Sequence, residues 1–374
     1  MEINRRTLLQ TAVTAPIAMS CGLAAKGAFA KDVSWLEQVQ RPPEVDLSAA
    51  RKKIGALQPL LIDNQGKEVR SRQAWEKYRA KLLAKWQSFL GPMPPREEPV
   101  KWTVKKQDQT KDFTRKLIRY NTEPGVSNEA YLLEPKNPAA DSQPLPAIVA
   151  LHQTSRQHIH EVAGVTGPKA QHLGPELCRL GFVVVCPKNY LWHETKNYLA
   201  AVERFKKRRP RTLGMHKMLY DAIRGVDVLR SLPFVDKNRI GTVGHSLGAK
   251  EVLYLMAFDP RVKAGVASEG GLTFRSTNWD APWYLGKGIY QKGFKLNHHQ
   301  LLALAAPRSL LVLAGEKGRG AADGNRSWPL IETALPVYRL YGKKARLGIY
   351  NHGQGHSIPP LARRYMQQWL QAYV

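Results

Sequence analysis

The segment that most constrains the fold is residues 239–248, where a short apolar run ends in Gly-His-Ser-Leu-Gly at 244–248. Residues 249–258 have the composition of a helix, so the segment predicts a strand, a sharp turn and a helix. Glycines two residues before and after Ser246 let the backbone turn tightly and leave the hydroxyl exposed at the helix N-terminus. This is the arrangement of a nucleophile elbow, with a chance match in a glycine-rich loop as the alternative. We therefore predict that Ser246 is a nucleophile.

Apolar runs and helix-like segments alternate along most of the chain. Residues 101–134 alternate polar and apolar positions, which is typical of antiparallel strands at the edge of a sheet. The repeated strand-helix alternation that follows predicts an α/β fold, with a mostly parallel, doubly wound sheet and helices on both faces. The continuous apolar runs typical of buried parallel strands stand at 147–151, 182–186, 262–267 and 309–313.

The composition divides the chain into three regions. Residues 1–30 have the pattern of an export signal, residues 31–99 form a polar, helical N-terminal extension, and residues 100–374 hold the sheet pattern. Two long stretches, 190–212 and 272–304, interrupt the alternation. Excursions beyond the C-terminal ends of strands commonly build binding sites in such folds, so we predict that both are cap segments.

The export signal rests on three features of the first 30 residues. Arg5 and Arg6 precede a mild apolar run, which is followed by Ala28-Phe29-Ala30. The paired arginines are similar to the twin-arginine type of signal, and the run is too short for a transmembrane helix. We expect cleavage after Ala30 and a periplasmic or secreted mature protein without a transmembrane segment.

The chain is strongly basic, with a formal charge of +27, and cleavage would leave +25. Such a charge attracts polyanions. The sequence shows no recognisable nucleic-acid-binding module, so acidic polysaccharides fit an exported protein better than nucleic acid does, and solubility alone is the simpler explanation. Cys178 and Cys186 remain after cleavage, and their settings predict two small buried residues more than a disulfide.

A serine hydroxyl becomes a good nucleophile only when a base removes its proton. In this architecture the chain order is serine, acid, histidine, with the histidine in the loop after the last strand. His352 and His356 lie there. We favour His356, because it follows two glycines that free its ring to point back across the strand ends. His352 is the alternative base, or a structural or substrate-contacting residue.

Three carboxylates compete for the role of the acid. Asp323 and Glu316 follow the apolar run at 309–313, where this architecture usually places the acid. Glu269 follows the preceding run, and its carboxylate can also approach the histidine because neighbouring strand ends lie only about 5 Å apart. Asp323 is the first choice and Glu269 the second. As alternatives, Asp323 caps a helix, and Glu269 pairs with an arginine such as Arg275.

The loop after 147–151 opens with His152 and Gln153. An oxyanion hole needs the backbone N–H of Leu247, the residue after the nucleophile, and a second N–H from this loop. We assign the second donor to Gln153. His152 either packs in the loop or contacts the substrate, and no metal or cofactor is expected.

By their motifs, the residues from about 91 to the C-terminus resemble the alpha/beta hydrolase superfamily. The narrower resemblance is to exported esterases of the dienelactone hydrolase and acetyl xylan esterase-like group. The elbow and the histidine loop are specific for the superfamily but not for a substrate. The motifs that carry the narrower resemblance are Leu-His-Gln-Thr at 151–154, Gly-His-Ser-Leu-Gly at 244–248, Ser-Glu-Gly-Gly at 268–271, Asn-Trp-Asp-Ala-Pro-Trp-Tyr at 278–284 and Asn-His-Gly-Gln-Gly-His at 351–356.

A second resemblance, to glucuronoyl esterases, bears on the acid. That family carries its catalytic glutamate at the position that Glu269 matches, and Lys250 matches a sugar-contacting lysine of the family. The sequence departs from the family at Leu247, where an arginine is expected. The resemblance therefore keeps Glu269 open as the acid.

Aromatic residues in the cap segments are candidates for substrate binding. Trp279, Trp283 and Tyr284 lie close together in the second segment, and Trp192 and His193 in the first segment can join them. Such side chains stack on a sugar ring or line an acyl pocket; alternatively, they anchor a long loop on the body.

The sequence thus predicts a serine hydrolase that cleaves carbohydrate-linked or small acyl esters through an acyl-enzyme. A peptidase of the prolyl oligopeptidase type would use the same triad, but normally carries a large propeller domain for which 374 residues leave no room. A non-catalytic glycan-binding protein would not need a nucleophile, a base and an acid together.

Overall fold

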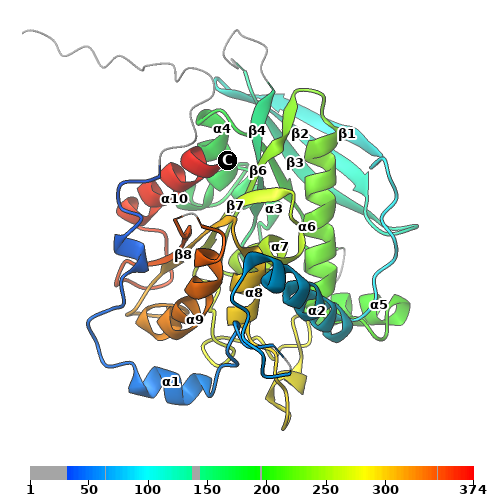
Figure 1. Ribbon diagram of the computed structural model, residues 1–374. Coiled ribbons are helices and arrows are strands. Elements are labelled where there is room, and N and C mark those ends of the chain that lie inside the picture. Colours follow the sequence, from blue (N-terminus) through cyan, green and yellow to red (C-terminus); the bar gives the residue numbers. More distant parts are fainter. Residues whose placement is uncertain (1–31, 64, 137–143, 194–195, 343) are drawn as a thin grey trace, which may run out of the picture. The chain divides into compact units, whose positions relative to one another are not determined.

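The computed structural model describes residues 32–63, 65–136, 144–193, 196–342 and 344–374 (Figure 1). Residues 32–374 form one packed unit. The predicted export signal at 1–30 lies outside the described residues.

A sheet of nine strands runs through the described chain, in the order β1-β2-β3-β5-β4-β6-β7-β8-β9. All neighbours from β5 to β9 pair in parallel, whereas β1, β2 and β3 form an antiparallel edge that joins β5. The predicted α/β fold class is therefore confirmed. The strands are β1 (Trp102–Gln109), β2 (Phe113–Asn121), β3 (Ser127–Pro135), β4 (Leu145–Leu151), β5 (Val183–Pro187), β6 (Val235–His245), β7 (Val262–Ser268), β8 (Ser309–Ala314) and β9 (Leu347–Asn351).

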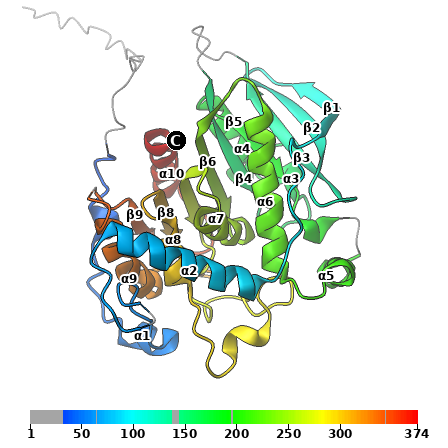
Figure 2. The same cartoon turned by 45° about the vertical axis from the view of Figure 1, so that its right-hand side comes forward.

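Helices cover both faces of this sheet (Figures 1 and 2). In β4, Ala147 and Val149 pack into one core, and Ile148 and Ala150 into the other, as the two-residue period of a strand requires. The first core is covered by α2 (Arg72–Leu90), α6 (Gly214–Ser231), α7 (Leu247–Phe258), α8 (His298–Ala305) and α9 (Trp328–Arg339). The second is covered by α3 (Ile159–Val162), α4 (Leu173–Arg179) and α10 (Pro360–Tyr373).

The N-terminal extension is built into the first core through α2. Ser71 caps this helix by accepting a hydrogen bond from the Ala74 amide at 3.2 Å. Trp75, Leu82 and Trp86 recur at helical spacing on the face that is buried. Because this face is apolar, the helix is held by packing against the rest of the fold as well as by its own cap.

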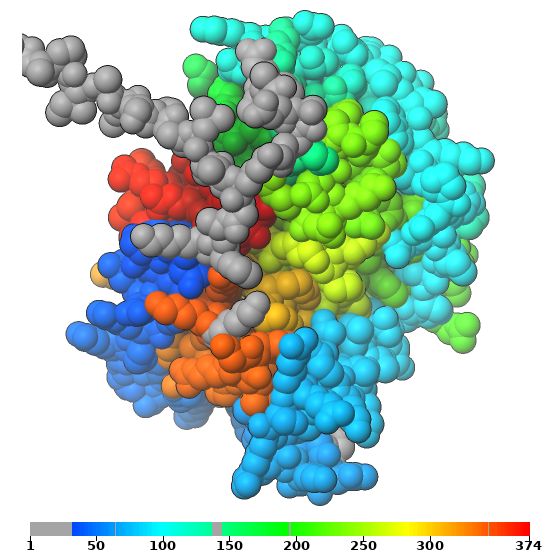
Figure 3. All heavy atoms as spheres, turned by 45° about the horizontal axis from the view of Figure 1, so that its top comes forward, coloured from blue at the N-terminus to red at the C-terminus, as the bar shows by residue number. Residues whose placement is uncertain are grey.

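The first described residues lie against the C-terminal helix (Figure 3). The ring of Trp35 stacks on Tyr365 of α10, with centroids 4.1 Å apart, and its Nε1 donates to Gln368 Oε1 at 2.7 Å. The short elements of this region are η1 (Gln38–Gln40) and α1 (Ser48–Ile54). The extension therefore touches both helical layers.

The two predicted cap segments differ in structure. Segment 190–212 contains η3 (Tyr190–Trp192) and α5 (Tyr198–Arg208). Segment 272–304 starts as a loop with η4 (Lys287–Tyr290) but ends in α8, whose residues are all buried and which packs against α7 and α9. The end of this segment is thus part of a helical layer. The remaining short turns are η2 (Lys169–Gln171) and η5 (Asn325–Ser327).

Cys178 and Cys186 are both buried and are not bonded to each other, as the sequence predicts. Within the described ranges, no helix combines the length and the apolar character that crossing a bilayer requires.

Candidate active site

The predicted catalytic residues follow parallel strands of one part of the sheet, β6 to β9, that end at the same level. Ser246 comes after β6, Glu269 after β7, and the loop that carries His356 and the alternative base His352 after β9. Because the C-terminal ends of these strands adjoin, residues distant in sequence meet at one edge of the sheet. The amides that tie the strand ends together are those of Ser246, which donates to Ser268 O at 2.8 Å, Glu269, which donates to Leu313 O at 2.9 Å, and His352, which donates to Ala314 O at 2.8 Å.

Ser246 has a backbone conformation that is rare for a residue with a side chain, with φ 57° and ψ −116°. Gly244 and Gly248 have no positive φ, so the turn itself does not require them. A Cβ on Gly248 would overlap the Leu151 carbonyl of β4, and a Cβ on Gly244 would overlap the backbone of Gly248. The glycines are therefore needed for close packing, and the turn strain lies in Ser246, which corrects the reason inferred from the sequence.

Two backbone N–H groups beside the nucleophile have no acceptor within the described residues. They belong to Leu247, the first residue of α7, and to Gln153, two residues beyond Leu151. Since Gly248 packs directly on Leu151, the N-terminus of α7 adjoins the loop that carries the Gln153 amide. Unpaired donors close to a nucleophile are what an oxyanion hole needs.

His152 holds the loop of Gln153 in place. Its ring Nε2 accepts a hydrogen bond from the Asn189 amide at 3.1 Å, so Nδ1 carries the proton and donates to the Gln153 carbonyl at 2.8 Å. Burial lowers the pKa of His152 to about 4, which keeps the ring neutral. The residue is 2% exposed. The structure therefore gives His152 a packing role and does not present it to a substrate.

His356 lies between β9 and α10, and its Nδ1 faces Glu269. The distance from Nδ1 to Glu269 Oε2 is 3.6 Å, and this nitrogen is buried without a hydrogen-bond partner in the described chain. The imidazole is 28% exposed, whereas the carboxylate is wholly buried. No hydrogen bond joins His356 to Ser246 among the described residues; in structures without substrate, catalytic hydrogen bonds are often long or poorly aligned.

Backbone amides hold Glu269 in position. Its Oε1 accepts from Gly315 N, and its Oε2 accepts from Ala322 N at 2.6 Å. Burial raises the pKa of the Glu269 carboxyl, and the nearby His356 ring and the hydrogen bonds from the two amides oppose that rise. The residue also has a positive φ of 58°, which is uncommon without glycine.

Asp323, the first choice for the acid from the sequence, is buried but engaged elsewhere. Its oxygens accept from the amides of Gly271 at 2.8 Å and Leu272 at 2.7 Å, and from Ser327 Oγ at 2.8 Å. In the described chain it has no hydrogen bond or ion pair with His356. The structure therefore brings Glu269, and not Asp323, to the histidine.

Glu316 and His352, the remaining alternatives, also have other partners. Glu316 Oε2 accepts from the Asn325 amide at 2.6 Å and from Asn351 Nδ2 at 2.7 Å. His352 Nδ1 accepts from the Gln354 amide at 3.2 Å, and burial lowers its pKa. Both side chains therefore shape the loops around the site.

Lys250 and two of the cap aromatics lie beneath the site instead of lining it. Trp279 and Tyr284 are 1% and 2% exposed, so their rings cannot stack on a sugar in this structure. The Lys250 ammonium lies 3.9 Å from the Trp279 ring centroid and donates to Gly270 O and Thr277 Oγ1, at 2.6 and 2.5 Å. These residues hold the loop after Glu269 in place. For Trp279 and Tyr284 the structure therefore fits the alternative in which the aromatic side chains anchor a long loop on the body.

Trp283 and Trp192 are half-buried, at the rim of the same region. The Trp192 ring meets His152 edge-on at 4.8 Å and lies 6.5 Å from the His158 ring. His158 has a strained backbone, with φ 39° and ψ −118°. Sequence reasoning did not find His158, because nothing in its neighbouring residues indicates a positive φ.

His245 is a second residue that the sequence did not single out. Its Nδ1 lies 3.0 Å from Ser268 Oγ, and its ring lies 4.6 Å from that of His356. Burial lowers the pKa of His245 to about 3, with smaller contributions from His356 and His352. A neutral ring thus packs against the candidate base. In the sequence, only the position of His245 directly before Ser246 could have indicated that it lies at the site.

Comparison with known proteins supports the architecture. Residues 129–288 match the model of the dienelactone hydrolase family. A Bacillus subtilis protein named "Putative hydrolase YtaP" is 25% identical over 301 residues, which cover 75% of this chain and 96% of that protein.

Solved structures show the same fold at low sequence identity. A glucuronoyl esterase from Solibacter usitatus is 20% identical, with a TM-score of 0.70 over 86% of this chain and 99% of its own. A CE15 glucuronoyl esterase from Teredinibacter turnerae is 20% identical, with a TM-score of 0.66 over 86% and 90%. An acetyl xylan esterase from Paenibacillus sp. R4 is 15% identical, with a TM-score of 0.55 over 88% and 100%. The chain thus has the alpha/beta hydrolase fold.

We predict that Gly248→Ala destabilises the protein by about 1–3 kcal/mol or more, because the added Cβ meets the Leu151 carbonyl, which is backbone and cannot swing aside. Urea denaturation measures the change. Gly288→Ala is the matched control, since a Cβ there meets no atom within 4 Å. Equal stability of Gly248→Ala and wild type would contradict the close packing described for the elbow.

We predict that Lys250 makes stability depend on pH. Burial lowers its pKa to about 7 from an ordinary value of 10.5. Between these values the unfolded chain binds more protons than the folded one, so the free energy of unfolding rises with pH, by about 2 kcal/mol from pH 7 to 9. Urea denaturation of wild type and Lys250→Met across this range measures the effect. The rise is absent from the variant; parallel curves for the two proteins would refute the assignment.

Proposed function

We propose that this chain, which carries a dienelactone hydrolase family domain, is an exported serine hydrolase that cleaves carboxylic esters, either carbohydrate-linked or small acyl esters. The observation that carries the proposal is that strained Ser246 and the His356–Glu269 pair follow strands whose C-terminal ends share one edge of the sheet. A partly exposed serine, a histidine with a carboxylate behind it and two unpaired amides are the parts that acyl transfer needs. The signal at 1–30 supports export from the sequence alone.

In the proposed reaction, Ser246 Oγ attacks the ester carbonyl carbon while His356 takes the hydroxyl proton on Nε2. Glu269 faces Nδ1 and stabilises the imidazolium that forms. The amides of Leu247 and Gln153 donate to the oxyanion. The bond to the alcohol oxygen then breaks, and the alcohol leaves with the proton from His356.

Deacylation repeats these steps with water. His356 takes a proton from the water as its oxygen attacks the acyl-enzyme carbonyl, and the amides again hold the oxyanion. The intermediate collapses by breaking the bond to Ser246, which recovers its proton from His356. The acid product leaves, and the enzyme returns to its starting state.

Glu269 is the better candidate for the acid on two grounds. Its carboxylate lies 3.6 Å from His356 Nδ1, whereas Asp323 uses its oxygens on the amides of Gly271 and Leu272. The position of Glu269, directly after β7, also matches the catalytic glutamate of the glucuronoyl esterases that the sequence resembles. We assign Asp323 a positioning role, because it holds the backbone immediately after Glu269.

A glucuronoyl esterase-like activity is the second candidate. The position of Glu269 favours it, and solved glucuronoyl esterases share the fold. Leu247 weighs against it, because this side chain is apolar and 2% exposed and cannot pair with a uronate as an arginine would. The general ester hydrolase remains the first candidate.

We predict that a fluorophosphonate probe labels the wild-type protein at one serine and leaves Ser246→Ala unlabelled. The probe reacts with a serine that an adjacent base has activated. Mass spectrometry of the labelled peptide identifies the residue. A folded wild-type protein that takes up no label, or that is labelled at another serine, would rule out the mechanism.

We predict that Glu269→Gln lowers kcat for p-nitrophenyl acetate by about 10⁴-fold, the scale seen when a triad acid is replaced by its amide. Asp323→Asn removes the charge that two backbone amides bind, so it lowers stability by about 1–3 kcal/mol and affects kcat less. Kinetics and urea denaturation on both variants separate the two roles. The reverse pattern, with kcat lost in Asp323→Asn and kept in Glu269→Gln, would reassign the acid.

A further inference from the structure

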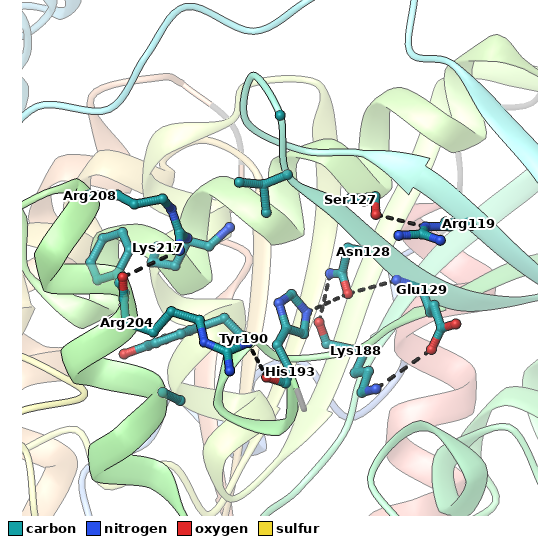
Figure 4. A pocket seen from close by; sticks show the side chains of 14 residues that line it. Arg119, Ser127, Asn128, Glu129, Lys188, Tyr190, His193, Arg204, Arg208 and Lys217 are labelled. Atoms are coloured by element: carbon teal, nitrogen blue, oxygen red, sulfur yellow. Dashed lines mark hydrogen bonds and ion pairs between the residues drawn. The ribbon is translucent and has the colours of Figure 1, made fainter. Parts of the chain in front are cut away.

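A pocket of about 260 Å³ opens near the catalytic edge, and none of its residues takes part in the proposed reaction (Figure 4). Four parts of the chain build it: the adjoining strands β2 and β3, the turn after β5, helix α5 and helix α6. Its size is close to the lower end of ligand pockets, roughly 300 Å³.

The lining of this pocket is strongly basic. Glu129 is its one acidic residue among the described ones, and His193 stands between two groups of bases in the close-up view (Figure 4). The basic residues are Arg119 from β2, Lys188 after β5, Arg204 and Arg208 from α5 and Lys217 from α6. Bases from separate elements that converge on one hollow create a concentrated positive potential.

Carboxylates offset this charge only in part. Lys217 is buried at the rear, where it pairs with Glu123 at 2.9 Å and Asp221 at 2.6 Å. Lys188 lies 3.6 Å from Glu129. Arg119 has no carboxylate within ion-pair distance among the described residues, and its Nε donates to Ser127 Oγ. The front of the pocket therefore keeps an excess of positive charge.

The excess of positive charge contributes to the protonation equilibrium of His193. Its Nε2 lies 2.7 Å from Asn128 Oδ1. Burial, and after it the nearby ammonium and guanidinium groups led by Lys217 and Lys188, together lower the pKa of His193 to about 3. A neutral histidine can donate or accept a hydrogen bond at the floor of an anion pocket without adding charge.

The pocket adjoins the catalytic edge. Lys188 follows β5, and β4 alone separates β5 from the nucleophile strand β6, so the lateral distance is about 10 Å. His193 directly follows Trp192, whose ring touches His152 of the oxyanion loop at 4.8 Å. The Lys188 charge also contributes to the lowered pKa of His152, behind burial. A sugar chain with its ester at Ser246 could therefore reach the pocket within a few sugar units.

From this arrangement we propose that the pocket is a subsite for a carboxylate-bearing sugar of an acidic polysaccharide, next to the sugar that carries the scissile ester. The role of the pocket as a subsite rests on the proposed function, but binding of the acidic chain does not. The pocket gives the excess positive charge of the chain a specific use. Arg119 and Lys188 would hold the carboxylate at the open side.

The test is calorimetric titration with trigalacturonate at low salt, in the Ser246→Ala background so that no ester in a probe is cleaved. We expect binding that weakens at least about tenfold in Arg119→Gln/Lys188→Gln, equivalent to loss of one charged hydrogen bond. We expect the fully methyl-esterified trisaccharide, which has no carboxylate, to bind the Ser246→Ala protein no more tightly than trigalacturonate binds the Arg119→Gln/Lys188→Gln variant. Thermal melting confirms that the variants are folded.

The matched control is Lys77→Gln/Lys81→Gln, which removes the same charge from the exposed side of α2, away from the pocket. Unchanged affinity in this control supports the proposal. Equal weakening in both double variants would mean non-specific attraction. Inorganic phosphate that binds as tightly as trigalacturonate and displaces it would mean a site for small inorganic anions. Either result, or the absence of trigalacturonate binding, overturns the proposal. Because the assay measures binding alone, loss of the fluorophosphonate reaction would refute the hydrolase without touching this result.

Discussion

The site depends on the contact between the N-terminus of α7 and strand β4. Gly248 packs on the Leu151 carbonyl at a separation that leaves no room for a Cβ. This contact places Ser246, the Leu247 amide and the loop of Gln153 together, and it holds Ser246 in a backbone conformation that costs on the order of 1–3 kcal/mol. Helix α7 is buried over residues 247–257, so the packing of an apolar helix supplies the free energy that maintains the strain.

Two buried carboxylates lock the loops behind the histidine. Glu269, from the loop after β7, accepts from Gly315 and Ala322 in the loop after β8. Asp323, from the loop after β8, accepts from two amides in the loop after β7. Each loop thus supplies a carboxylate to the other, which satisfies charges that would be costly to bury unpaired. The exchange keeps the Glu269 carboxylate at a fixed place facing His356.

The excess of basic residues has two structural settings. Lys217 and Arg224 are buried and paired with carboxylates, so their charges are largely compensated inside the fold. Arg119 and Lys188 stand at the open side of the pocket beside the catalytic edge, where less compensation is available. Net charge alone does not distinguish these settings. Basic residues that count equally toward the net charge therefore stabilise the fold in one place and, as proposed, bind an anionic ligand in another.

Residues close together in the sequence determined the elements of this protein. The alternation of apolar runs predicted the sheet and its helices, and the strand, serine and helix around Ser246 predicted the elbow, because periodicity and turn geometry are local properties. Tertiary structure decided which side chains face one another. Asp323 and Glu269 both follow strands, and Trp279 and Tyr284 both lie in a loop, but only the packed loops bring Glu269 to His356 and bury the two aromatic rings. These outcomes depend on contacts between residues far apart in the chain, which no local pattern encodes.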